Sequence, residues 1–354
     1  MNHYPSNVKE KLNSIILSMA EHHWLFSKNP GHDFTRQHLG KLSFYDTMRL
    51  IISMRKGRTN DEIMDYFDLD PDLIPSQSAF CQRRRQISLS AFEYLFSEFS
   101  SSFPSTTDKF KDHCILACDG CHVVYATNSD IIEDYNKPRL IDYKGYNHMH
   151  LNGFVDVISK AFLDVVIQPR QQPDEREALH SMLDHFTPDD PQKYIITADR
   201  GYESYDLLFH CELKNLGYVF RVKSPSSPKS ILSYYASELP DDLEEFDVTI
   251  KRFFTDKATN IMKSQSDVYR YINPSKNTPH FYELLRKNHS HLYFLQFRVV
   301  KIKTAENTYE YLITNLPFSF TLDDIQECYH WRWGIEISFR YLKHAAGLLY
   351  FHSK

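Results

Sequence analysis

The chain has 354 residues, 42% of them hydrophobic and 14% aromatic, so it is long enough to bury a sizeable core and to form two or three domains. It has no apolar run near the ~18 residues of a membrane span, and its N-terminus lacks the basic and apolar blocks of a secretory signal, which argues against a membrane protein and a secreted one. The six cysteines lack the spacing of a disulfide framework and indicate reduced thiols, as in the cytoplasm.

The net charge of −5 does not suggest nucleic-acid binding, but the distribution of basic residues matters more than the sum. Lys and Arg gather at residues 55–58 (RKGR), at Arg83, Arg84 and Arg85, and in a segment near the C-terminus. Each cluster taken alone is better explained by a solvated surface. Together they provide places where phosphates would lie.

Residues 1–108 are expected to form a helical N-terminal domain. Residues 42–54 have apolar side chains at helical spacing, and Thr59 and Ser76 can cap helices over residues 60–67 and 77–86. The segment between these two helices (DLDPDLIP) has turn composition, and the second helix ends on the three arginines. This order is compatible with a DNA-reading helix-turn-helix, although an ordinary helical bundle has the same pattern. Residues 101–108 have the composition of a linker.

From residue 110 the pattern changes to alternating strands and helices. Strands are expected over residues 113–127, 148–159, 161–168, 194–198 and 218–222, with helices over 174–186 and 203–216. Three strands, helix, strand, helix is the order of a ribonuclease H-like fold. That order puts Asp119 on the first strand and Asp199 at the tip of the fourth, each after an apolar run. Taken singly, a turn before Gly120 and a cap for the next helix explain these aspartates better.

Residues 224–307 interrupt this order and are expected to form a mainly β insertion, with strands over 249–254, 268–272 and 292–300. Residues 308–354 return to the core with a strand over 311–316 and a helix from Leu322, which Thr321 and Asp324 can cap. The predicted fold is therefore α/β: a ribonuclease H-like mixed sheet over 109–223 and 308–354, the β insertion, and an all-helical domain before them.

The segment 329–343 (YHWRWGIEISFRYLK) carries a line of charge. On one helix, five residues fall within an arc of about 80°: Tyr329, Arg332, Glu336, Arg340 and Lys343. Beside them an apolar stripe predicts a largely buried helix: Trp331, Ile335, Phe339, Leu342 and Ala346. A buried carboxylate among cations is costly unless it is paired or bound to an ion. From the pattern alone, a salt-bridge ladder at i, i+4 spacing explains the segment equally well.

The spacing Tyr-x-x-Arg-x-x-x-Glu-x-x-x-x-x-x-Lys, formed by Tyr329, Arg332, Glu336 and Lys343, resembles the YREK signature of DDE transposases of bacterial insertion sequences, in the group named for insertion sequence four. The stretch TADRGYESYDLL resembles the second-aspartate motif of that family, and FTRQHLGKLSFYDTMRLIISM and IPSQSAFCQRRRQI resemble its N-terminal region.

The resemblance implies a catalytic and metal-binding role for three carboxylates, those of Asp119, Asp199 and Glu336. It also implies that Tyr329, Arg332 and Lys343, with Arg340 beside them, bind phosphates of the transposon end. The N-terminal region, with Arg83, Arg84 and Arg85, would bind the terminal inverted repeats.

Three carboxylates at one edge suit hard divalent cations, so we expect two ions of Mg²⁺ or Mn²⁺ rather than zinc. Asp119 would bridge both ions, and Asp199 and Glu336 would bind one each. The family implies cut-and-paste transposition, in several members through a hairpin at the excised end, with the freed 3′-hydroxyl joined to target DNA. The expected partners are the double-stranded DNA of the inverted repeats and the target, and a second copy in a homodimer on DNA. The expected location is the bacterial cytoplasm, at the nucleoid.

Alternatives stay open at this point. The chain ends at Lys354, eleven residues after Lys343, whereas members of this group usually continue through a further helical segment. One alternative is therefore a truncated, inactive relative that binds transposon ends, and another is a metal-dependent nuclease without strand transfer. A zinc site at Cys114, Cys118 and Cys121 is disfavoured because strand residues alternate faces, and a structural or DNA-facing role is favoured for His148 and His150.

Overall fold

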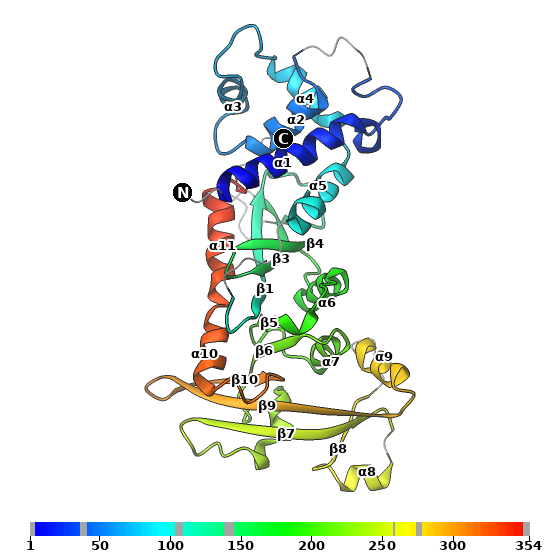
Figure 1. Cartoon of the computed structure of the whole chain (residues 1–354), viewed down its shortest axis with the longest axis vertical. Coiled ribbons are helices and arrows are strands. Elements are labelled where there is room, and N and C mark those ends of the chain that lie inside the picture. The colour runs from blue at the N-terminus through cyan, green and yellow to red at the C-terminus, as the bar shows by residue number, and fades with distance from the viewer. Residues whose placement is uncertain are drawn as a thin grey trace. The chain divides into compact units, whose positions relative to one another are not determined.

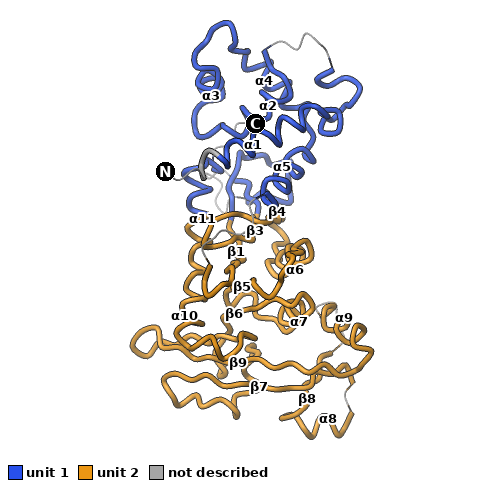
Figure 2. The backbone as a smooth tube through the Cα atoms, in the orientation of Figure 1, with its two compact units in different colours: residues 1–104, 122–149, 339–354 blue, residues 105–121, 150–338 orange. Residues whose placement is uncertain are grey.

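The structure is a computed structural model that describes residues 4–35, 41–102, 109–137, 145–257, 259–273 and 278–349. It is mixed α/β with one large mixed sheet, as predicted (Figure 1). The chain divides into two compact units, shown in two colours in Figure 2. The first unit comprises Met1–Pro104, His122–Met149 and Phe339–Lys354, and the second comprises Ser105–Cys121 and His150–Ser338. Of the predicted linker, residues 103–108 lie outside the described residues.

The first unit contains five helices in the described part of residues 1–104: α1 (Tyr4–Glu21), α2 (Phe44–Ser53), α3 (Thr59–Tyr66), α4 (Gln77–Gln86) and α5 (Leu89–Ser101). Met19, Met48 and Ala91 are buried together and join α1, α2 and α5 into a small core. Ser76 caps α4 as predicted, since its side chain accepts a hydrogen bond from the Ala79 N–H. Thr59 is not a cap but the first residue of α3.

The connection from α3 to α4, residues 67–76, is longer than the turn of three or four residues in a helix-turn-helix. The prediction of two short helices is therefore confirmed, while their connection departs from that motif. A further short strand of this unit, β2 (Tyr135–Asn136), pairs with residues 146 and 147 and had no counterpart in the sequence prediction.

The sheet lies mainly in the second unit, and its strand order is β2-β3-β1-β5-β6-β10-β9-β7-β8, with β4 paired to β3. Its strands are β1 (Cys114–Tyr125), β3 (Tyr146–Asp156), β4 (Ala161–Pro169), β5 (Tyr194–Ala198), β6 (Gly217–Val222), β7 (Phe246–Thr255), β8 (Tyr269–Tyr271), β9 (Leu292–Ala305) and β10 (Thr308–Thr314). β5 pairs in parallel with both β1 and β6, whereas β10 is antiparallel to β6 and β9. The predicted return of the chain to the core as a strand near residue 311 is confirmed.

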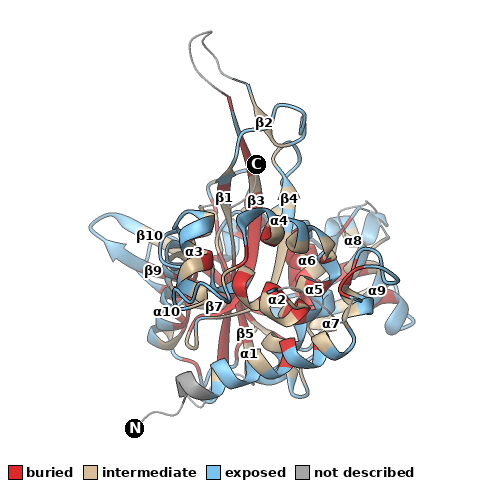
Figure 3. Ribbon diagram, turned by 90° about the horizontal axis from the view of Figure 1, so that it is seen from above, coloured by how far each residue is buried: buried red, intermediate tan, exposed pale blue. Residues whose placement is uncertain are grey.

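Helices cover both faces of the central strands. The helices α6 (Glu175–His185) and α7 (Tyr205–Leu213) bury one face with Leu116, Ile196 and Phe220 in the largest hydrophobic cluster. The helix α10 (Leu322–His330) lies on the opposite side in Figure 1 and contacts β6 and β9. The buried residues concentrate in these strands and the helices against them (Figure 3).

The insertion does not form a sheet of its own. Its strands β7, β8 and β9 continue the central sheet beyond β10, because β9 pairs with both β10 and β7. The insertion also contains two helices that the sequence prediction did not include, α8 (Asn260–Ser264) and α9 (Pro279–Lys287). Phe281, Leu284 and Leu285 bury α9 against the core that contains α7.

Candidate active site

The strand register brings Asp119 and Asp199 side by side. β1 and β5 are parallel, with Ala117 paired to Thr197, so continuing this register by two places sets Asp119 beside Asp199. Adjacent strands are about 4.8 Å apart, and residues two apart share a face of the sheet. Both aspartates therefore share the face of Ala117 and Thr197, opposite to the face buried under α6 and α7. An acidic edge follows directly from the pairing of two apolar strands.

Asp119 lies in a largely buried environment that disfavours its charged form. Its side chain is 24% exposed, its Oδ1 accepts the Gly120 N–H at 2.8 Å, and its Oδ2 is 3.6 Å from Arg332 Nη1. Burial, together with the neighbouring Asp199 and Glu175 carboxylates, raises the pKa of Asp119 to about 6, although Gly120 and Arg332 act in the opposite direction. The charged form of Asp119 is thus stabilised less here than in water.

The predicted single helix over residues 329–343 is wrong. The helix α10 ends at His330 and α11 (Trp333–His344) begins after a turn, in which the Arg332 N–H bonds Tyr329 O and the Gly334 N–H bonds Trp331 O. These i to i−3 bonds wind more tightly than an α-helix and rotate the second helix relative to the first. Trp331 and Ile337 are consequently exposed, while Ile335 and Phe339 of the predicted stripe are buried.

This turn positions Arg332 between two of the predicted carboxylates. Arg332 is 5% exposed, and its Nη2 lies 3.3 Å from Glu336 Oε1 while Nη1 faces Asp119. Gly334 permits the approach, because a Cβ there would lie 3.1 Å from Val157 Cβ and 3.2 Å from Val157 O. The beginning of α11 thus lies against the backbone that follows β3.

The three predicted carboxylates do not form one tight ligand group. Among the residues that the structure describes, their oxygens do not form a group within 4.8 Å of one another. Instead the Arg332 guanidinium lies between Asp119 and Glu336. Its two terminal nitrogens each contact one of these carboxylates, so Asp119 Oδ2 and Glu336 Oε1 are no more than about 9 Å apart. Without a cation, three clustered carboxylates repel one another, and the arginine supplies the counter-charge. Glu336 is 39% exposed at its side chain and can change rotamer.

The sequence analysis did not assign Glu175 and His150 to the site, although both lie at this edge. Glu175, at the start of α6, adds to the negative field on Asp119, and its Oε1 is 3.0 Å from the Nε2 of buried His150. Gly120 packs directly against His150 and Glu175. His150 appeared in the sequence as half of a histidine pair on one strand face, but nothing local linked it to Glu175, 25 positions away.

We expect Gly120→Ala to lower the activity of this site by roughly 100-fold, because displacing reacting groups by about 1 Å has effects of that size. The new Cβ would lie 2.3 Å from His150 Nε2 and 2.6 Å from Glu175 Oε1, so the pair must move. Activity and far-ultraviolet circular dichroism would be measured on both proteins. Gly31→Ala is the control, since nothing lies within 4 Å of a Cβ at that position. Full activity of Gly120→Ala would show that the His150–Glu175 pair is not needed.

The remaining predicted phosphate ligands are distributed over both units. Tyr329 is 4% exposed, and the Arg332 guanidinium lies over its ring at 5.6 Å. Arg340 is exposed and Lys343 is partly exposed, both on the part of α11 that belongs to the first unit. The salt-bridge alternative is present in part, as the Arg332–Glu336 ion pair.

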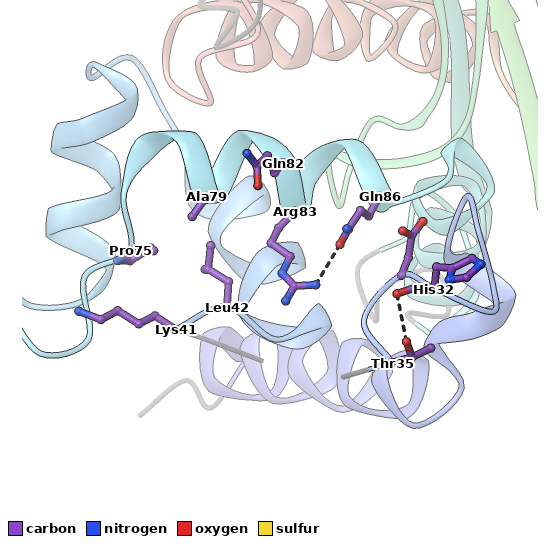
Figure 4. Close-up of a pocket in the computed structure, with 10 residues that line it drawn as sticks. His32, Thr35, Lys41, Leu42, Pro75, Ala79, Gln82, Arg83 and Gln86 are labelled. Atoms are coloured by element: carbon purple, nitrogen blue, oxygen red, sulfur yellow. Dashed lines mark hydrogen bonds between the residues drawn. The ribbon is translucent and has the colours of Figure 1, made fainter. Parts of the chain in front are cut away.

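The three arginines of α4 do not form one exposed basic face. Arg83 packs over Phe34 and donates to Gln86 Oε1 at 3.0 Å, and Arg84 packs over Phe80, whereas Arg85 is exposed. Arg83 and Lys41 line a cavity of about 470 Å³ between α4 and the segments around His32 and Leu42 (Figure 4). Asp33 also lines this cavity, and Lys41 Nζ donates to Pro71 O and Ile74 O, both at 3.0 Å.

No described helix is both long enough and apolar enough to cross a membrane. A comparison with curated proteins gives no match. The family described as "Transposase DDE domain" matches residues 110–354. Among solved structures, the "Cryo-EM structure of piggyBac transposase synaptic complex with hairpin DNA (SNHP)" is similar at 10% identity with a TM-score of 0.43, over 84% of this chain and 57% of that one. The chain thus spans little more than half the length of that transposase.

Carboxylate oxygens gathered at one edge of a mixed sheet are donors of the kind that hard divalent cations prefer. The family match covers more than half of the chain, so this protein belongs to the DDE transposase family.

Proposed function

We propose that this protein is a DNA transposase that cleaves the ends of an insertion sequence and joins them to target DNA, with Asp119, Asp199 and Glu336 as its catalytic carboxylates. The observation that carries the proposal is the register of β1 and β5. Continued two places beyond its last pair, Ala117 and Thr197, this register brings together two aspartates 80 positions apart, and Arg332 contacts both Asp119 and Glu336. Family membership supplies the reaction class.

The strand order supports a ribonuclease H-like core. The order β4-β3-β1-β5-β6, with β1, β5 and β6 parallel and α6 leading into β5, follows the predicted sequence of three strands, helix, strand and helix. The positions of Tyr329, Arg332, Glu336 and Lys343 favour the group named for insertion sequence four, whose signature has this spacing.

The acidic edge fits hard divalent cations. Its donors are carboxylate oxygens, which Mg²⁺ and Mn²⁺ prefer. Burial first, and then the neighbouring Asp199 and Glu175 carboxylates, raise the pKa of Asp119, and a bound cation would favour its charged form. Asp119, Asp199 and Glu336 would hold two such ions. When bound, the ions would supply activation of the attacking hydroxyl and stabilisation of the leaving oxygen.

The other residues of the site bind and orient DNA. Arg332 neutralises Asp119 and Glu336 in the structure, and its planar fork suits a phosphate equally well. Tyr329, Arg340 and Lys343 would bind neighbouring phosphates, which position DNA without reading its sequence. Recognition of the inverted repeats is assigned to the N-terminal helices with Arg83, Arg84 and Arg85, and a homodimer would hold both ends.

The test is a cleavage and joining assay on duplex DNA that carries the inverted repeats flanking the gene, with Mg²⁺ or with EDTA. We expect cleavage at the element boundary and joining to a plasmid target, both only with the metal. Cleavage without joining of pre-cut ends would favour a metal-dependent nuclease, and specific binding without cleavage would favour an inactive end-binding relative.

We expect Arg332→Gln to weaken binding to transposon-end DNA and to make the slope of log K against log salt shallower by about 0.9, the loss of one phosphate contact. Binding would be measured by fluorescence anisotropy between 50 and 200 mM salt, values spanning the range over which phosphate contacts dominate. Arg286→Gln, an exposed arginine on α9, is the control. An unchanged slope for Arg332→Gln would mean that Arg332 contacts only the carboxylates.

A further inference from the structure

Three histidines meet where α9 packs against α7, which in turn contacts α6 (Figure 1). His180 is on α6, His210 on α7 and His280 on α9, and each offers a ligand atom within 4.8 Å of the other two. Among the described residues they are the one group of three that meets this distance. Their rings stack, with His210 and His280 centroids 3.8 Å apart.

Two carboxylates fix which nitrogen of two of these rings carries a proton. Asp206 Oδ2 is 2.7 Å from His280 Nδ1, and Asp184 Oδ1 is 3.2 Å from His210 Nε2. A carboxylate only accepts, so these two nitrogens donate, and the opposite nitrogen of each neutral ring keeps a lone pair. Metal-binding histidines in proteins typically have this arrangement, with the second ring nitrogen donating to a carboxylate.

His180 and His210 are joined by a hydrogen bond between the nitrogens that would bind the ion. His180 Nδ1 donates to His210 Nδ1 at 2.9 Å, and two nitrogens on one tetrahedral zinc ion would be ~3.3 Å apart, so a small movement would admit the ion. His180 Nε2 lies 3.7 Å from Asp206 Oδ2, so a shift of the His180 proton to that nitrogen frees Nδ1 for a metal. No net proton is released by that exchange.

The cluster is reached from the side of His180 and His280. The side chain of His210 is 2% exposed, whereas those of His180 and His280 are 13% and 12% exposed. An ion would enter past these two rings.

We propose that His180, His210 and His280 bind one divalent transition-metal ion of the Zn²⁺ type. Nitrogen donors without thiolate suit Zn²⁺, Co²⁺, Ni²⁺ and Cu²⁺ over the hard cations that suit the acidic edge. The ion ties α9 of the insertion to α6 and α7 of the central sheet. Asp206 already links these elements, because its Oδ1 accepts the His280 and Phe281 N–H groups at 3.0 and 3.2 Å. The site shares no residue with the acidic edge and does not depend on the proposed reaction.

The test titrates EDTA-treated, dialysed full-length protein with Co²⁺ and follows its visible absorption, with Zn²⁺ as competitor. With Mg²⁺ in excess to occupy the acidic edge, we expect one Co²⁺ to bind with the spectrum of nitrogen ligation and to be displaced by Zn²⁺. His180→Gln and His280→Gln should each weaken Co²⁺ binding by at least about 100-fold. His185→Gln, which replaces an exposed histidine on the same helix, should bind Co²⁺ as the unchanged protein does.

Thermal unfolding gives an independent measurement. Saturating Zn²⁺ should raise the unfolding temperature of the unchanged protein by roughly 5 °C and leave the two glutamine variants unaffected. The proposal is overturned if the unchanged protein gives no Co²⁺ spectrum, if the His180→Gln and His280→Gln proteins bind Co²⁺ as tightly as the unchanged protein, or if His185→Gln abolishes the spectrum. In those cases the histidines are a metal-free stack or the ion binds elsewhere.

Discussion

Asp119→Asn, Asp199→Asn and Glu336→Gln are each expected to lower the rate of transposon-end cleavage by at least about 10³-fold while end binding is retained. The magnitude follows because bound cations contribute several kcal/mol to the transition state, and 1.36 kcal/mol is tenfold in rate. The amide variants keep the shape of each side chain and remove the charge that would hold the ions. Of the three residues, Asp119, which contacts Arg332, should lose the most cleavage activity when it is substituted.

Single-turnover cleavage and anisotropy would be measured on the same preparations, with Asp323→Asn as the control. Asp323 is an exposed carboxylate and the second residue of α10. The Asp323→Asn protein should cleave DNA at the normal rate. A variant among the three that cleaves at the normal rate is not part of the site, and normal cleavage by Glu336→Gln in particular would remove the reason for assigning α11 to it.

Locally encoded elements were predictable from the sequence. The strand β5 has the predicted bounds 194–198, since its apolar run ends at a turn, and Thr321 and Asp324 form the predicted capping box at the start of α10. The helix α9 had signals that were not used: Pro279 at its first position, and Phe281, Leu284 and Leu285 at helical spacing.

The features that the sequence did not reveal depend on contacts between distant segments. The break after His330 and the approach of Gly334 to Val157 depend on packing against the end of β3, which no periodicity over 329–343 encodes. The proximity of Glu175 to Asp119 follows from where α6 begins relative to β1. The pairing of Asp119 with Asp199 was inferable from the order of strands, but its register required the structure.

Asp119→Asn is expected to stabilise the metal-free protein at pH 8 by up to about 3 kcal/mol, although it abolishes cleavage. The pKa of Asp119 is about 6 in the folded protein and near 3.8 when unfolded, so folding favours the protonated form. Stability from this group is therefore fully present below about pH 4, falls as the pH rises to about 6, and stays low above that. Asparagine is neutral throughout and avoids this loss.

Urea unfolding in EDTA, at pH 4.5 and pH 8, checks this prediction. The gain in the free energy of unfolding from Asp119→Asn should be large at pH 8 and much smaller at pH 4.5, where the folded carboxyl is already protonated. Asp323→Asn should show no such difference. A destabilising effect of Asp119→Asn at pH 8 would mean that the contact with Arg332 outweighs burial and the repulsion from Asp199 and Glu175. We expect this change in the free energy of unfolding to be a gain. Carboxylates that are close enough to bind cations repel one another when no cation is bound, and this repulsion lowers the stability of the folded protein.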